Sequence, residues 1–385
     1  MARTEKLLAD LIALPSVNPA FASQNTSTAR PARLSEKFGE KNIADFVASI
    51  AACAGLDVDF QRVLPARPNV VARLRPRGKI HQTILLAPHL DTVNADDGQF
   101  VPRRKNGRLH GRGACDTKGS VAAMLVALCE LAERKERPRA TEIVFAGLID
   151  EENAQAGSRA FARSKFKADL AIVGEPTRLQ VVTAHKGSLW LEMETRGVAA
   201  HGATPQFGKN AVHEMARIVD GLQTDYADSL KRRQKHRLLG LPTINVGVIC
   251  GGVQPNIVPD RCVITIDRRT LPGETEAGVK REITSFLRAR NLRAQIADKK
   301  LAPALPLETD HRLPLVQRFL RSVGQTRPLG VHFFCDAAVL AAGRIPSIVF
   351  GPGDVAQAHT TDEWISIAEL ERGKNLLLKF LSSLP

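Results

Sequence analysis

Histidine and carboxylate side chains gather in five short segments of this chain. Their members are His89 and Asp91 in HLD, Asp116 in HGRGACDTKGS, Asp150, Glu151 and Glu152 in DEE, Glu175 in IVGEP, and His359 in AHTTDEW. Imidazoles and carboxylates bind zinc and similar divalent ions, and they also transfer protons in hydrolytic reactions. These segments are therefore the candidates for a catalytic metal site.

The first two segments also fit purely structural roles. His89 and Asp91 are two residues apart at the end of an apolar run, so both side chains point to one side of a strand. Asp91 could fix the tautomer of a metal-bound His89, or the two residues could form only a capping pair. Asp116 precedes a helical pattern and could cap that helix, although Gly113 and Gly119 beside it also favour a ligand loop.

The joint placement of the segments favours a metal site. The three adjacent carboxylates of DEE repel one another unless a cation neutralises them. Four of the five segments lie at or just after the carboxyl ends of predicted strands, where open α/β sheets bind ligands. Two histidines and three carboxylates suit two Zn²⁺ ions, or Co²⁺ or Mn²⁺, with one bridging carboxylate and a nearby Glu that takes a proton from water.

The elements that must position these residues follow a βαβ rhythm. Apolar runs predict buried strands at 83–91, 142–152 and 169–176, a buried helix at 119–134, and a further strand and helix at 344–353 and 366–384. The amino terminus predicts an amphipathic helix that ends before Pro15. Such an alternation is typical of an α/β sheet flanked by helices.

A second domain interrupts this pattern. Residues 188–196 alternate between apolar and polar, as in a half-solvated antiparallel strand, and further strands and helices are predicted at 209–223, 243–250, 261–269 and 274–290. We therefore predict a catalytic domain of residues 1–183 and 303–385, and an inserted α+β lid domain of residues 184–302.

Composition excludes several other classes of protein. The chain has 385 residues, 44% apolar and 24% charged, which is ordinary for globular proteins and unlike disordered or disulfide-stapled ones. Its net charge is +14, but the basic residues are scattered, and the densest run at 231–237 is typical of a solvated helix face. Aromatic residues make up only 5%, so we expect no nucleic-acid partner.

The cysteines and the amino terminus point to the cytoplasm. The six cysteines form no C-x-x-C pair, which favours free, buried thiols in a reducing compartment. Asp10 interrupts the apolar part of the first helix, which argues against a signal peptide. No apolar stretch approaches the ~20 residues of a membrane span, so we expect no membrane partner.

Eight segments together resemble one known family of enzymes. They occur in family order along nearly the whole chain and read HLDTV, GRGACDTKGS, DEE, VGEPT, GVAAHGATP, GGVQPNIVPD, DRRTLPGE and GPGDVAQAHTTDEW. They resemble the dinuclear zinc amidohydrolases and exopeptidases that include acetylornithine deacetylase, succinyl-diaminopimelate desuccinylase, aminoacylase-1 and glutamate carboxypeptidase. This resemblance implies a zinc-exopeptidase-like mixed sheet, with a lid that also forms a homodimer.

The resemblance also implies roles for the candidate residues. One metal ion would be held by His89, Asp116 and Glu175, and the other by Asp116, Glu152 and His359. Glu151 would be the general base, and Asp91 would orient His89.

In the lid, His201 would reach the active site of the dimer partner and stabilise the oxyanion. Asn256 and Arg269 would contact the tetrahedral intermediate and the substrate carboxylate, and Gly353 would make a backbone contact near that carboxylate. Without the family, His201 would be read as a surface histidine and Arg269 as a surface strand charge.

The implied activity is hydrolysis of an N-acyl-L-amino acid, with N-acetyl-L-ornithine as the first choice. A desuccinylase, a metallo-dipeptidase and a carboxypeptidase of the same family are alternatives, and a non-catalytic binding protein on the same fold is an alternative outside the class. Phe334 and Cys335 stand where many relatives carry Thr or small residues, which leaves the acyl-group preference open.

Overall fold

The computed structural model describes residues 1–24, 37–134, 137–299 and 304–385, which divide into two compact units. The first unit contains Met1–Thr183, Thr309–Leu329 and Cys335–Pro385. The second contains Ala184–Glu308 and Gly330–Phe334. The domain boundary expected at residues 302–303 lies outside the described residues.

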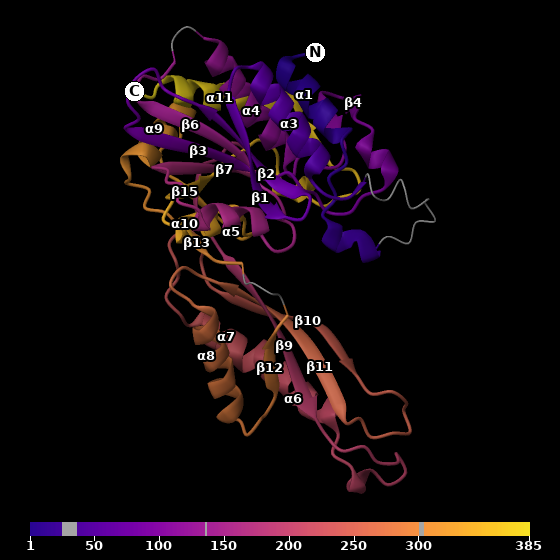
Figure 1. The fold of residues 1–385 in the computed structure, drawn as a ribbon. Helices are drawn as coiled ribbons and strands as arrows, with labels where there is room; N and C mark the ends of the chain where they lie inside the picture. The colour runs from indigo at the N-terminus through magenta and orange to yellow at the C-terminus, as the bar shows by residue number, and fades with distance from the viewer. Residues whose placement is uncertain (25–36, 135–136, 300–303) are drawn as a thin grey trace. The chain divides into compact units, whose positions relative to one another are not determined.

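A large mixed sheet, most of whose strands belong to the first unit, forms the centre of that unit (Figure 1). Within the described residues it has nine strands, in the order β1 (Asp57–Leu64), β2 (Arg67–Leu74), β6 (Thr141–Gly147), β3 (Gln82–Pro88), β7 (Leu170–Gly174), β15 (Ser347–Val349), β8 (Val182–His185) and β13 (Leu307–Glu308), with β14 (Leu329–Val331) beside β8. The central pairs β6–β3, β3–β7 and β7–β15 are parallel, whereas β1–β2 and β2–β6 are antiparallel. The central parallel strands are almost entirely buried, which explains their continuous apolar runs.

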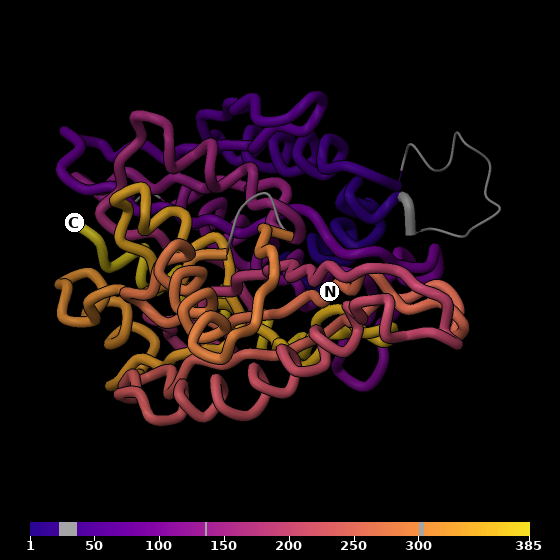
Figure 2. Tube along the Cα trace, turned by 90° about the horizontal axis from the view of Figure 1, so that it is seen from below, coloured from indigo at the N-terminus to yellow at the C-terminus, as the bar shows by residue number. Residues whose placement is uncertain are grey.

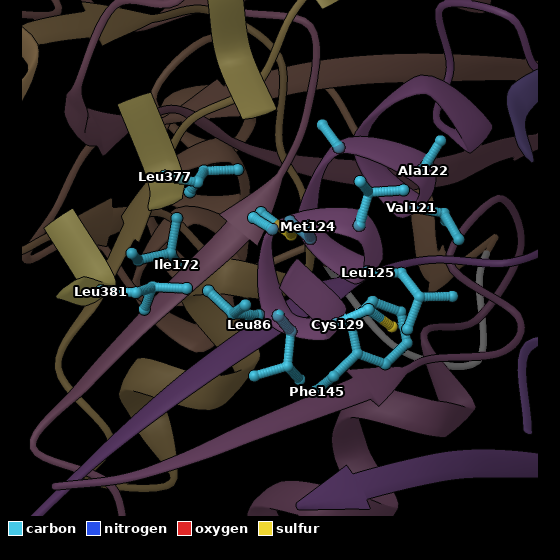
Figure 3. Close-up of a cluster of buried hydrophobic side chains, with 14 of the residues drawn as sticks. Leu86, Val121, Ala122, Met124, Leu125, Cys129, Phe145, Ile172, Leu377 and Leu381 are labelled. Carbon is cyan, nitrogen blue, oxygen red and sulfur yellow. The ribbon is translucent and has the colours of Figure 1, made fainter. Parts of the chain in front are cut away.

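Helices cover both faces of this sheet (Figure 1). One face carries α1 (Arg3–Ile12), α3 (Lys41–Cys53), α4 (Lys118–Glu133), α9 (Pro314–Val323) and α11 (Ile367–Ser382). The other carries α5 (Ala156–Arg163) and α10 (Asp336–Ala342). The helix α4 lies at the centre of the core, where Met124 faces Ile172 of β7 and Leu377 of α11 (Figure 3). This buried helix anchors the glycine-rich loop that precedes it.

A smaller sheet of the first unit joins two distant segments. It pairs β4 (Arg103–Lys105) with β5 (Arg108–His110), and β5 with β16 (Trp364–Ser366). The register sets Trp364 opposite His110 and Ile365 opposite Leu109. As a result, the glycine-rich loop after β5 begins beside the segment that leads into β16.

The second unit is a four-stranded antiparallel sheet with helices on one face. The strand order is β10 (Thr243–Gly251), β11 (Arg261–Thr270), β9 (Gly187–Arg196) and β12 (Gln295–Asp298). Its helices are α6 (Ala211–Gly221), a π-helical turn (Leu222–Tyr226), α7 (Ala227–Lys231) and α8 (Glu276–Arg288). The ring of Tyr226 packs edge-on against that of Phe286 of α8, with 5.3 Å between the ring centroids. In Figure 2 the pink coils of α6 and α7 lie next to the orange coil of α8.

Two expectations about details are corrected by the structure. All six cysteines are free, but Cys53 and Cys250 are exposed rather than buried. The strand predicted at 142–152 already ends at Gly147, because Asp150 adopts a φ of 66° and the chain turns at residues 151–154. Among the described helices, none has the length and apolarity that crossing a membrane requires.

Candidate metal centre

The ends of three neighbouring strands bring most of the candidate residues together. His89 follows β3 directly, Glu175 follows β7 directly, and Glu151 and Glu152 lie on the turn after β6. These strands are parallel neighbours, so their carboxyl ends meet at one edge of the sheet. This is the edge at which open α/β sheets bind ligands.

Asp116 reaches this edge from the glycine-rich loop before α4. Its Oδ1 lies 3.1 Å from Nε2 of His89, and its Oδ2 lies 3.3 Å from Nε2 of His359. Thr117, not Asp116, is the N-cap residue of α4, so the carboxylate faces the two imidazoles rather than the helix. Asp116 therefore stands between the two histidines, where a bridging ligand would be needed.

The remaining ligand candidates surround this pair of contacts. Nε2 of His359 is 3.2 Å from the carboxylate of Glu152, and Nε2 of His89 is 3.9 Å from Oε1 of Glu175. His89, Asp116 and Glu152 offer ligand atoms that all lie within 4.8 Å of one another. His359 comes ten residues after β15 and follows a 3₁₀ turn, so it lies farther from its strand than expected.

The electrostatics of the cluster fit a bound cation. Burial is the main cause of the raised pKa of Glu151 and of Glu175, and neighbouring carboxylates raise both further, although His89 opposes the shift. Burial also acts to raise the pKa of Asp116, but hydrogen bonds from His359 and His89 outweigh it and lower that pKa. Buried carboxylates repel one another unless a cation neutralises them, and two of these, Asp116 and Glu152, lie within hydrogen-bonding distance of an imidazole. Such a set of donors suits divalent metal ions.

His359 is held as a cation in this arrangement. Hydrogen bonds to Asp116 and Glu152 raise its pKa to about 10, although its partial burial opposes the shift. Because a metal ion binds only the neutral imidazole, metal binding here would release a proton.

Asp91 has a broader structural role than the sequence implied. Nδ1 of His89 lies 3.0 Å from the backbone oxygen of Asp91 and 3.5 Å from its Oδ1. The carboxylate also accepts the backbone N–H groups of Glu151 at 3.0 Å and Glu152 at 3.1 Å, and the amide of Asn18 at 2.8 Å. Asp91 thus holds the turn that carries two site carboxylates, and Asn18 is a contributor that sequence reasoning missed.

Glu363 is a second residue that sequence reasoning missed. Its carboxylate is 1% exposed and accepts four hydrogen bonds from Arg112 and from the backbone of the loop that carries Asp116. A signal was present in the sequence, because a loop rich in glycine leaves backbone N–H groups that need an acceptor.

The backbone of Gly353, expected near the substrate carboxylate, is already hydrogen-bonded to other residues of the protein. Its N–H donates to Oε1 of Glu369 at 3.1 Å, and its carbonyl accepts from the N–H of Arg178 at 2.8 Å. A side chain here would meet Sγ of Cys115 at 2.6 Å, and its φ is 95°, so glycine is required for local packing. A substrate contact by this backbone stays a prediction.

The remaining candidates belong to the second unit. His201 and Asn256 are exposed and lie on adjacent segments, because the N–H of Gly202 donates to the carbonyl of Asn256 at 2.8 Å. Arg269, near the end of β11, pairs with Asp267 at 2.8 Å and lies 6.0 Å from the ring centre of Phe334. The aromatic residue that departs from the family pattern is therefore a neighbour of the proposed carboxylate-binding arginine.

Cys335 lies in the first unit, unlike its neighbour Phe334. It is 1% exposed and precedes α10. Burial raises the pKa of its thiol well above the usual value, and the nearby Glu175 raises it further. Its closeness to the charges of Glu175 and Glu151 places this position beside the candidate metal centre.

The fold and the cluster together define a hydrolase of the metallopeptidase type. A model of peptidase family M20/M25/M40 matches residues 85–383, and the chain belongs to this family. It is 30% identical to the acetylornithine deacetylase of Proteus mirabilis (strain HI4320), and the match covers 97% of this chain and 94% of that relative. The family recognised from the sequence motifs is thereby confirmed.

Solved structures confirm the predicted fold class. A tripeptidase from Staphylococcus aureus aligns with a TM-score of 0.77 at 20% identity, covering 99% of this chain and 97% of its own. A dinuclear metal binding peptidase of the M20 family from Bacillus subtilis aligns with a TM-score of 0.69 at 14% identity, covering 99% and 97%. At such identities the likeness establishes the fold alone.

Proposed function

We propose that this protein hydrolyses the amide bond of an N-acyl-L-amino acid, with N-acetyl-L-ornithine as its substrate. The observation that carries the proposal is the placement of Asp116 between His89 and His359, at 3.1 Å and 3.3 Å. The acetylornithine deacetylases among its relatives support the choice of substrate.

Two divalent ions would be held by the residues of this cluster. His89, Asp116 and Glu175 would hold one ion, and Asp116, Glu152 and His359 the other. The mixed nitrogen and oxygen donors favour Zn²⁺, with Co²⁺ or Mn²⁺ as alternatives. When bound, such ions supply Lewis-acid polarisation of the amide carbonyl and lower the pKa of a bound water.

The chain's own residues would perform the proton transfers and position the substrate. Glu151 would take a proton from the attacking water and pass it to the leaving amine. Arg269 would bind the substrate carboxylate, since a guanidinium matches a carboxylate with two parallel hydrogen bonds. Asn256, and His201 of the partner subunit, would stabilise the developing oxyanion.

Two groups of alternatives remain. A metallo-dipeptidase or carboxypeptidase of the same peptidase family is the second candidate, and a succinyl-diaminopimelate desuccinylase also fits the motifs. A non-catalytic binding protein would be expected to lack the base or a metal ligand. The chain carries Glu151 as well as all five ligand candidates, which argues against that role.

A hydrolysis screen tests the choice of substrate. We expect the zinc- or cobalt-loaded protein to hydrolyse N-acetyl-L-ornithine with a kcat/KM about 10-fold or more above that for N-succinyl-diaminopimelate or simple dipeptides. Amine release is measured for each substrate, with the Glu151→Gln variant as the control for contaminating activity. Faster hydrolysis of a dipeptide or of the succinyl substrate would replace the proposed substrate, and hydrolysis of none would favour a binding protein.

A second copy of the chain is the proposed partner. The strand β10 lies at an edge of the four-stranded sheet, and Val248 and Ile249 on it are 58% and 57% exposed. Val253, just beyond the strand, is 90% exposed. Exposed apolar edge strands are typical of interfaces, so we propose that the second unit forms a homodimer along β10. A cytoplasmic location stays a prediction from the cysteine pattern.

Subunit mixing tests whether His201 acts across the dimer. His201→Ala and Glu151→Ala proteins should each be inactive. Every active site of the first lacks the partner's imidazole, and every active site of the second lacks the general base. After random 1:1 mixing, half of the dimers are mixed and half of their sites are complete, so about a quarter of wild-type activity should return. Amide hydrolysis is measured before and after exchange, with mass spectrometry to verify the mixed dimers. Verified mixed dimers without activity would show that His201 does not serve the partner's site.

A further inference from the structure

We propose that Glu363 is a positioning residue of the metal centre, which fixes the loop of residues 112–116 and thereby the carboxylate of Asp116. The inference rests on the proposed function, because it assumes that Asp116 binds metal ions. It adds a buried residue that lies outside the proposed ligand set.

The contacts of Glu363 account for both of its oxygens. Oε1 accepts the backbone N–H of Cys115 at 2.8 Å and that of Asp116 at 2.9 Å. Oε2 accepts the N–H of Gly113 at 2.9 Å and Nη1 of Arg112 at 2.7 Å. Hydrogen bonds to a buried carboxylate are stronger than neutral ones, so four of them define the path of this loop closely.

The loop needs such an anchor because its own conformation is unusual. Gly113 has a φ of 81°, and Gly111 has a φ of 153°. Glycine has the widest choice of backbone conformations and loses the most conformational entropy on folding. The sequence of this loop therefore does little to fix its backbone, and contacts with the rest of the protein must do so. Since the N–H of Asp116 is itself one of the four donors, the carboxylate of Glu363 fixes the backbone from which the bridging side chain extends.

Glu363 also links the two halves of the ligand set. It lies four residues after His359, and the N–H of Gly111 donates to its backbone carbonyl at 3.0 Å. The residues that follow Glu363 form β16, which pairs with β5 just before the glycine-rich loop. One residue therefore holds the segment of His359 against the loop of Asp116, and metal ligands must be held to within ~0.5 Å for tight binding.

A purely structural role for Glu363 would be to neutralise Arg112. The side chain of Arg112 is 4% exposed, so loss of its partner leaves a buried charge unpaired. A single substitution would therefore combine two effects. The double variant Arg112→Met/Glu363→Gln separates them, because it removes the unpaired charge together with the acceptor.

The test measures metal affinity rather than activity. Metal-free wild-type, Glu363→Gln and Arg112→Met/Glu363→Gln proteins are titrated with Zn²⁺ against a chromophoric chelator, and with Co²⁺ by visible absorption. We expect the wild type to bind two ions. Both variants should bind them about 10–100-fold more weakly, as is typical when a residue that hydrogen-bonds to a metal ligand is removed. The double variant should unfold at a higher temperature than Glu363→Gln.

A matched control distinguishes lost positioning from general destabilisation. Glu130 of α4 pairs with Lys374 of α11 at 3.1 Å, so Glu130→Gln removes a partly buried ion pair from the same unit without touching the ligand loops. Its affinity for Zn²⁺ should equal that of the wild type. Wild-type affinity in the double variant would overturn the positioning role. A wild type that binds no metal ion would instead overturn the proposed function, and with it this inference.

Discussion

Replacing Glu151 by glutamine should lower kcat for amide hydrolysis by about 10²–10⁴-fold, the usual contribution of a general acid–base group. Glutamine keeps the size of the side chain but cannot accept a proton from water or return it to the leaving amine. The measurement is the steady-state rate on N-acetyl-L-ornithine, together with the metal content of the purified variant. We expect two ions per chain, as in the wild type.

The environment of Glu151 explains why it suits this role. Its side chain is buried, its backbone N–H donates to Asp91 at 3.0 Å, and burial raises its pKa well above the ordinary value. A carboxylate with a raised pKa is a stronger base, which favours removal of a proton from water. Glu142 near the opposite end of β6 is the matched control, and Glu142→Gln should keep wild-type activity. Loss of metal from Glu151→Gln would assign this residue to the ligands instead.

Replacing Asp116 by asparagine should abolish tight binding of both metal ions, because this carboxylate is the group between His89 and His359. The loss of metal affinity should exceed the ~10–100-fold loss that follows removal of a residue hydrogen-bonded to a metal ligand. A ligand that binds only the folded state stabilises it by about 2.7 kcal/mol at 100 times its dissociation constant. Zn²⁺ should therefore raise the unfolding temperature of the wild type but not that of the variant.

The control for Asp116→Asn is the same change at an exposed site. The exposed side chain of Asp59 on β1 accepts the N–H of its own neighbour Phe60 at 2.8 Å, so Asp59→Asn should keep both the metal content and the Zn²⁺-dependent rise in unfolding temperature. Calorimetric titration with Zn²⁺ gives the stoichiometry directly. If Asp116→Asn lost one ion and kept the other at wild-type affinity, Asp116 would be a ligand of a single ion and not a bridge.

The sequence by itself determined the strands and the helix at the centre of the fold. Continuous apolar runs in the sequence become β3, β7 and α4. Such runs can be predicted to be buried because the pattern lies within the segment itself. His89 and Glu175 follow two of those strands without a gap, so their meeting at one sheet edge could be predicted from parallel strand order. The turn after β6 was harder, because Leu148 and Ile149 continue the apolar run beyond the end of the strand.

Only the tertiary structure decided how the metal centre is held together. Asp91 bonds to the turn of Glu151 and Glu152, and Glu363 accepts the N–H of Asp116 from 247 residues away. The physical reason is that a buried N–H group must find an acceptor, but nothing in its local sequence says which distant residue will supply one. Chain folding makes that choice by packing β16 against β5, and the positions of the ligands follow from it.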